Sequence, residues 1–177
     1  MSRSFPMKVE ATPVGHVATP LPFYAKPGDA GLDLPIAIRP GIECRDEDGD
    51  VFLAGQDDTT GSAYLTDPST LVLLPGVSAR LPTGWAFAIP EGHEGQVRPR
   101  SSSSHRRIHV ALGTIDAGYR GEVLVTVENR TGGRLSIRTG DRLAQLVIAP
   151  VAMARLVVVE ALDATERGTA GHGSTGT

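Results

Sequence analysis

"TLVLLPGVSARLPTGWAFAIPEGHEGQVRPR" spans residues 70–100 and sets the expectation for the fold. Its apolar runs are short, and clusters of proline and glycine such as Pro75-Gly76 separate them. Runs this short between turn formers favour the strands of an all-β sandwich or barrel. The pattern continues to about residue 160 through "EVLVTVEN" and "RLSIRTGDRLAQLVIAPV". Within it, Gly140-Asp141 and Pro150 bracket "GDRLAQLVI" and favour a turn followed by a strand over a helix.

Composition limits the classes of function. The chain has 177 residues, a net charge of −3 and a pI near 5.9, which suits one domain and excludes a generally basic nucleic-acid binder. A small anionic ligand needs only a local group of arginines and stays possible. No apolar run approaches the roughly 20 residues of a membrane span, and the N-terminal residues have no apolar core of signal-peptide length. With a single cysteine, Cys44, these features predict a cytoplasmic protein without a membrane partner.

Residues 42–70 differ from their surroundings, because they are acidic and rich in turn-forming residues. We expect a surface insertion, for example a mobile hairpin. The carboxylates of "DEDGD" leave a calcium loop as the alternative, although the spacing of an EF-hand is absent. Cys44 has no metal-ligand spacing around it and is interpreted as a small structural or surface residue.

Residues 167–177, "RGTAGHGSTGT", are rich in glycine. Composition predicts a flexible tail. A tail with one arginine and many backbone N–H groups could also wrap around a phosphate, and composition does not choose between the two.

Five short segments carry chemical groups, and each is weak evidence alone. They are "DAGLDL" (29–34), "RPRSSSS" (98–104), "GTIDAGYRGEV" (113–123), "GDRLAQ" (140–145) and the tail. In this order they resemble the five motifs of the deoxyuridine triphosphate nucleotidohydrolases (dUTPases) of the trimeric type. The resemblance covers roughly residues 8–176, and the third segment is the most specific.

The resemblance implies a distorted jelly-roll or β-barrel domain over residues 1–166, with a flexible C-terminal arm over residues 167–177 that closes over the active site. It implies hydrolysis of dUTP to dUMP and pyrophosphate, which keeps uracil out of DNA and supplies dUMP for thymidylate synthesis. Mg²⁺ would be held through the substrate phosphates and water, with no direct protein ligand. The expected assembly is a homotrimer with shared active sites.

The resemblance also implies roles for individual residues. Asp116 would orient a water and take its proton, and Tyr119 would stack under the deoxyribose and exclude a 2′-hydroxyl. Arg167 would reach the γ-phosphate, and Asp33 would support the site beside the metal and an arginine. The remaining expected substrate contacts are Arg100, Ser101, Ser102, Gly113, Gln145, His172, Gly173 and Ser174.

Three departures from the family pattern bear on the site. His172 stands where most members have an aromatic lid over the uracil. Val110 stands where many have a base-contacting asparagine, so uracil recognition is expected to use backbone groups near Gly113. The acidic segment 42–70 lies outside the motifs.

Three other interpretations stay open. The first is a dCTP deaminase or a bifunctional deaminase and dUTPase, which the chain resembles through "RSS" and "IDAGY". The deaminase needs a glutamate ten positions after the aspartate, where this chain has Thr126; Glu128 is offset by two. A regulatory protein-binding module on the same scaffold is the rival that is not an enzyme. His105 and His109 could hold zinc, although no further ligand cluster accompanies them.

Overall fold

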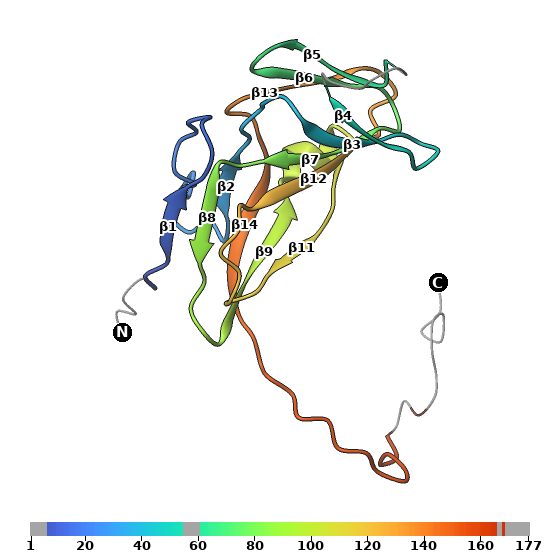
Figure 1. Ribbon diagram of the computed structural model, residues 1–177. Coiled ribbons are helices and arrows are strands. Elements are labelled where there is room, and N and C mark those ends of the chain that lie inside the picture. Colours follow the sequence, from blue (N-terminus) through green and yellow to red (C-terminus); the bar gives the residue numbers. More distant parts are fainter. Residues whose placement is uncertain (1–6, 55–60, 166–167, 169–177) are drawn as a thin grey trace.

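The computed structural model describes residues 7–54, 61–165 and 168, and they form an antiparallel all-β fold (Figure 1). Two sheets form the centre. One has the strand order β11 (Gly113–Ile115), β9 (His93–Pro99), β14 (Arg142–Pro150) and β2 (Leu32–Pro35). The other has the order β10 (Ile108–Val110), β12 (Leu124–Asn129), β7 (Ser78–Pro82), β3 (Ile42–Arg45) and β4 (Val51–Ala54).

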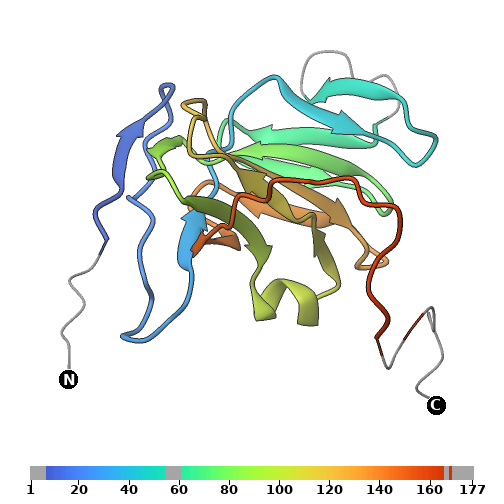
Figure 2. The same cartoon turned by 90° about the horizontal axis from the view of Figure 1, so that it is seen from below.

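Two smaller sheets complete the described chain. β1 (Glu10–Pro13) pairs with β8 (Trp85–Ala88), and β6 (Thr70–Leu73) lies between β13 (Leu135–Arg138) and β5 (Ala63–Asp67). The single described helix, α1 (Ser101–His105), joins β9 to β10 at one end of the molecule (Figure 2). The all-β expectation is confirmed. The described strands form open sheets, so the jelly-roll-like form is observed and not a closed barrel.

Alternation along the strands builds one core between the sheets. In β12, Val125 and Val127 are buried while Thr126 between them is exposed. Leu34, Ile36 and other aliphatic side chains from both central sheets belong to the same cluster. Side chains of neighbouring strand residues point to opposite faces, so this alternation fixes which face of each strand meets the core.

Glycine shapes two turns that matter for the site. Gly84 (φ 78°) connects β7 to β8, and Gly140 (φ 91°) precedes β14. Both lie in the left-handed region that glycine adopts without steric cost. The turn at Gly140 is followed by a strand, as the sequence predicts.

Segment 42–70 is less separate from the body than an insertion would be. β3 pairs with both β4 and the central strand β7, and Ile42, Cys44 and Ala54 are buried in the core. The acidic residues gather at the tip of the β3–β4 hairpin, where Asp46 accepts a hydrogen bond from the backbone N–H of Asp50. Because these acidic residues lie between the two strands, the apolar alternation of β3 and β4 is hard to recognise in the sequence. Residues 55–60 lie outside the described residues.

No helix in the described part of the chain is long and apolar enough to cross a membrane.

Candidate active site

Asp33 is the centre of a cationic cluster. Its side chain is 7% exposed, and its two carboxylate oxygens each bind a different arginine. Oδ1 lies 2.7 Å from Nε of Arg100, and Oδ2 lies 3.1 Å from Nη1 of Arg142. Hydrogen bonds between charged groups are stronger than neutral ones. The pair of contacts therefore fixes two guanidinium groups side by side at the surface.

The register of the four-stranded sheet brings these segments together. Asp33 on β2 lies opposite Gln145 on β14, which lies opposite Arg98 on β9. Arg100 follows β9 in an extended conformation and precedes α1, and its Nη1 donates to the carbonyl of Arg142 at 2.8 Å. Three segments that are far apart in sequence thus meet at one end of the sheet.

Of the four serines in α1, Ser103 is buried and the other three are exposed. Ser103 is buried, and its hydroxyl donates to the carbonyl of Leu143 at 2.7 Å, which ties the helix to β14. Ser101 and Ser102 are exposed beside Arg100. The arrangement offers two exposed hydroxyls next to a fixed cation, and this suits an anionic ligand.

Gln145 is held by its neighbours. Its amide Nε2 donates to the carbonyl of Pro99 at 3.0 Å. Gly31 is buried against it, and a Cβ on Gly31 would come within 3.0 Å of Cβ of Gln145. The glycine of "AGLDL" therefore leaves the space that the glutamine occupies.

Two residues of the cluster had no role assigned from the sequence. Arg142 shares the carboxylate of Asp33 with Arg100. Its guanidinium carbon also lies 5.6 Å from the ring centroid of Phe23, within the range of a cation–π contact. The signal for Arg142 was its place in "GDRLAQ", whereas nothing local in the sequence indicates Phe23.

A second group surrounds the turn after β11. The backbone N–H of Tyr119 donates to the carbonyl of Asp116 at 3.0 Å and closes the turn. Both side chains are exposed and line a pocket of about 210 Å³. Gly113 lines the same pocket, and the rest of the lining is Arg80, Val97, Thr114, Ile115, Glu122, Val123 and Leu124. The pocket therefore presents a carboxylate, an aromatic ring and the edge strand β11 to a single ligand.

These two groups do not meet within one chain. Ile115, at the end of β11, lies opposite Gly95 on β9. The next residue, Asp116, is therefore level with position 94, which is four residues along β9 from Arg98. At roughly 3.3 Å per residue this is about 13 Å. No hydrogen bond or ion pair joins the group of Asp33 to the group of Asp116 among the residues that the structure describes.

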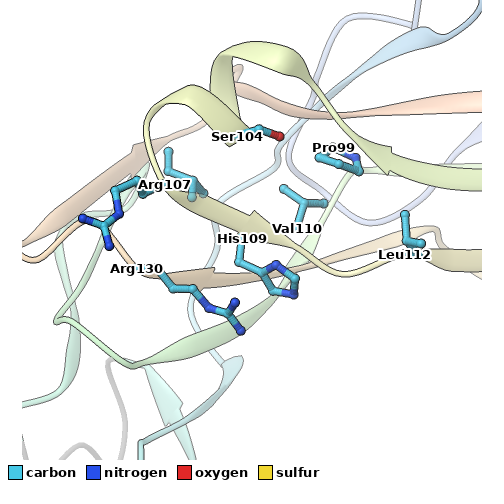
Figure 3. A pocket seen from close by; sticks show the side chains of 8 residues that line it. Pro99, Ser104, Arg107, His109, Val110, Leu112 and Arg130 are labelled. Atoms are coloured by element: carbon cyan, nitrogen blue, oxygen red, sulfur yellow. The ribbon is translucent and has the colours of Figure 1, made fainter. Parts of the chain in front are cut away.

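A larger hollow of about 460 Å³ is lined by residues of α1 and β10 and their neighbours (Figure 3). Its lining includes Pro99, Val110 and Leu112, with Arg107 and Arg130 at the rim. This hollow contains neither Asp116 nor Tyr119. We therefore place the chemistry in the pocket of Asp116, although that pocket is smaller. Val110 is 3% exposed and lines this hollow, and is not part of the lining of the Asp116 pocket.

Comparison with known proteins decides the family. The family model for dUTPase matches residues 64–176. A deoxyuridine 5′-triphosphate nucleotidohydrolase of Caulobacter vibrioides is 40% identical over 165 residues, covering 92% of this chain and 89% of that protein. The chain belongs to the dUTPase family.

Solved dUTPase structures have the same fold. The dUTPase of Staphylococcus bacteriophage 80alpha, determined with dUPNHPP, matches with a TM-score of 0.74 and 25% identity over 96% of this chain and 99% of that one. A dUTPase of S. aureus phage phi11, described with a structural Mg(II) ion, matches with a TM-score of 0.66 and 25% identity over 88% and 98%. The dUTPase family membership therefore agrees with the observed architecture.

The fifth dUTPase motif lies almost entirely outside the described residues. Arg167, His172, Gly173 and Ser174 all fall there, and only Gly168 of this motif is described. Their expected roles, and that of the C-terminal arm, stay predictions.

The residues considered for other chemistries lie elsewhere. Thr126 is exposed on β12, and Glu128 accepts two hydrogen bonds from Arg130, at 2.8 and 2.6 Å. Neither lines the pocket of Asp116, so the carboxylate that a dCTP deaminase needs is not beside that pocket. In the described ranges, no group of three or more His, Cys, Asp or Glu side chains is arranged to hold a metal ion.

Proposed function

We propose that this chain hydrolyses dUTP to dUMP and pyrophosphate. The observation that carries the proposal is the turn of Asp116 and Tyr119, which sets a carboxylate and an aromatic ring at one pocket in a chain of the dUTPase family. The reaction removes a precursor of uracil in DNA and yields the substrate for thymidylate synthesis. A cytoplasmic location remains a prediction from the sequence.

The roles follow from chemistry and placement. Water is a poor nucleophile near neutral pH, so Asp116 would orient a water for attack on the α-phosphorus and accept its proton. Tyr119 would form the wall under the deoxyribose, and the exposed edge of β11 at Gly113 would offer backbone groups to uracil.

The phosphates would lie against the Asp33 cluster. Arg100 and Arg142 would neutralise charge on the triphosphate, with further contacts from Ser101, Ser102 and Gln145. From the C-terminal arm, Arg167 would reach the γ-phosphate, and His172, Gly173 and Ser174 would cover the nucleoside. Catalysis would come from positioning and from neutralisation of charge in the transition state.

Mg²⁺ is the cofactor that we propose. Both oxygens of Asp33 are bound by arginines, so this carboxylate is not free to ligate the ion directly. Phosphate oxygens and water would hold it, an arrangement that Mg²⁺ favours because it dehydrates reluctantly. The ion would neutralise charge on the phosphates.

A homotrimer with shared active sites is the assembly that we propose. The separation of the Asp33 cluster from Asp116 supports it, because a second copy could supply the missing half of each site. The chain after β14 supports it too: it leaves the body of the molecule (Figure 1), and Met153, Leu156 and Val158 are 90%, 92% and 99% exposed. An apolar stretch this exposed is typical of a segment that another chain covers, and closed cyclic symmetry is the usual outcome.

Release of pyrophosphate from dUTP, dTTP, dCTP and UTP tests the function directly. We expect turnover of dUTP with Mg²⁺ and strong discrimination against the other three nucleotides. Deamination of dCTP, or the absence of any turnover with dUTP, would contradict the proposal.

A further inference from the structure

An ion pair lies next to the turn of Asp116 and Tyr119, and its glutamate lines the same pocket as they do. Glu122 follows this turn, and its side chain is only 11% exposed. Nη2 of Arg39 lies 2.7 Å from Oε2 of Glu122, and Nη1 donates to Oε1 at 3.3 Å. The contact is bidentate, and this geometry fixes a carboxylate in orientation as well as in position.

A third donor completes the clamp on Glu122. The backbone N–H of Gly84 donates to Oε1 at 2.8 Å, from the turn between β7 and β8. The next residue of the chain, Val123, is held as well, because its N–H donates to the carbonyl of Trp85 and its carbonyl accepts from the hydroxyl of Thr83. The end of the turn is thus fastened to two segments that are distant in sequence.

The backbone of the clamped residue supports the tyrosine. The hydroxyl of Tyr119 donates to the carbonyl of Glu122 at 3.0 Å. A side chain at Gly121 would collide with the ring, since a Cβ there would lie 3.0 Å from Cε2 of Tyr119. The exposed ring therefore rests on residues 121–122, and the Glu122 carboxylate determines where those residues lie.

We infer that Arg39 and Glu122 are positioning residues that hold Tyr119 as the wall against ribonucleotides. The inference rests on the proposed dUTPase function and assigns selectivity for the sugar to an ion pair whose glutamate holds the ring through its backbone carbonyl. Glu122 also lines the Asp116 pocket, but its two carboxylate oxygens are engaged by Arg39 and Gly84. We therefore assign it a role through Tyr119 and not a direct contact with the nucleotide. Releasing the clamp lets the ring move aside, and the pocket then admits a 2′-hydroxyl.

The test compares kcat and KM with dUTP and with UTP for the full-length protein and four variants. These are Arg39→Ala, Arg39→Lys, Tyr119→Phe and the double variant Arg39→Ala/Tyr119→Phe. We expect the ratio of kcat/KM for dUTP over UTP to fall about tenfold in Arg39→Ala, the scale of one coupled interaction. The ratio should fall less in Arg39→Lys, because lysine keeps the positive charge but lacks the planar guanidinium.

The double variant separates positioning from general destabilisation. If Arg39 acts through the tyrosine hydroxyl, Tyr119→Phe alone should reproduce the fall in the ratio, and the double variant should fall no further. The matched control is Arg130→Ala, which removes another bidentate Arg–Glu pair, to Glu128, away from the Asp116 pocket. It should leave the ratio unchanged.

An unchanged ratio in Arg39→Ala, or multiplicative effects in the double variant, would overturn the inference while the wild type still hydrolyses dUTP. If Arg39→Ala does not fold, Arg39→Lys and Tyr119→Phe test the inference instead. A ratio of kcat/KM for dUTP over UTP that is unchanged in both variants would overturn the inference. A wild type without dUTP turnover would instead contradict the proposed function and the inference with it.

Discussion

Nε of Arg100 lies 2.7 Å from Oδ1 of Asp33, so the most buried carboxylate of the candidate site points the guanidinium outward. Nη1 of Arg100 is also engaged, with the carbonyl of Arg142. Within residues 7–165 as described, Nη2 makes no hydrogen bond. One edge of a fixed guanidinium is therefore available for the phosphate contact that we propose for Arg100.

Replacing Asp33 with asparagine keeps the shape of the side chain but removes the charge that both arginines share. We expect kcat/KM for dUTP to fall by up to about 10²-fold, because misplacing a binding group by about 1 Å can cost that much. Steady-state kinetics measures the change. Asp67→Asn is the control, since Asp67 accepts hydrogen bonds from Ser69 in an exposed turn and should leave kcat/KM unaltered.

Asp116→Asn tests the general base. Asparagine can still hydrogen-bond to a water but cannot take its proton, so kcat should fall by about 10²–10⁴ while dUTP still binds. Rapid-quench kinetics and calorimetric titration with dUTP measure the two effects. A kcat close to that of the wild type would remove this role from Asp116.

Removal of residues 167–177 tests the proposed arm. The core strands all precede these residues, so thermal unfolding should shift little. Loss of kcat/KM should be large, with the roughly 10³–10⁵ of arginine fingers in other phosphoryl-transfer enzymes as an upper bound. If the shortened protein turned over dUTP as fast as the full chain, Arg167 would have no part in the reaction.

Glu128 makes a pH-dependent contribution to stability. Hydrogen bonds from Arg130 lower the pKa of Glu128 from its ordinary value near 4.5; the charges of Arg130 and His109 add to this effect, and burial opposes it. A lowered pKa in the folded state means that the stabilisation is present above the unfolded value and is lost as pH falls through the folded pKa. In Arg130→Ala, an NMR titration should place the pKa of Glu128 higher than in the wild type; an unchanged pKa would mean that Arg130 is not the cause.

The sequence predicts much of the fold, because alternation and turn chemistry are local properties. The strand after Gly140-Asp141 illustrates this. The β3–β4 hairpin was less evident, because its acidic tip makes the alternation of Ile42 and Cys44 hard to recognise in the sequence. Those residues become part of the core only because β3 pairs with β7.

The sequence proposes residues for the candidate site but does not give their geometry. Motif order indicates Asp33 and Arg100, but the sharing of that carboxylate with Arg142 depends on how β14 pairs with β2, where the register shifts between Arg142 and Ala144. The clamp on Glu122 joins Arg39 and Gly84 across 83 and 38 residues of sequence. No pattern in one chain encodes such pairs, because only the folded topology makes them neighbours.

Activity restored by mixing two inactive variants tests the central claim most directly, namely that this chain hydrolyses dUTP at sites divided between copies. Asp116→Asn would be co-refolded with Arg100→Ala at equal amounts, and dUTP turnover compared with each variant alone. In a threefold ring, three quarters of randomly mixed trimers contain both variants, and each of these has one intact site out of three, so about a quarter of wild-type activity should return. Activity no higher than the average of the two separate variants would contradict the account.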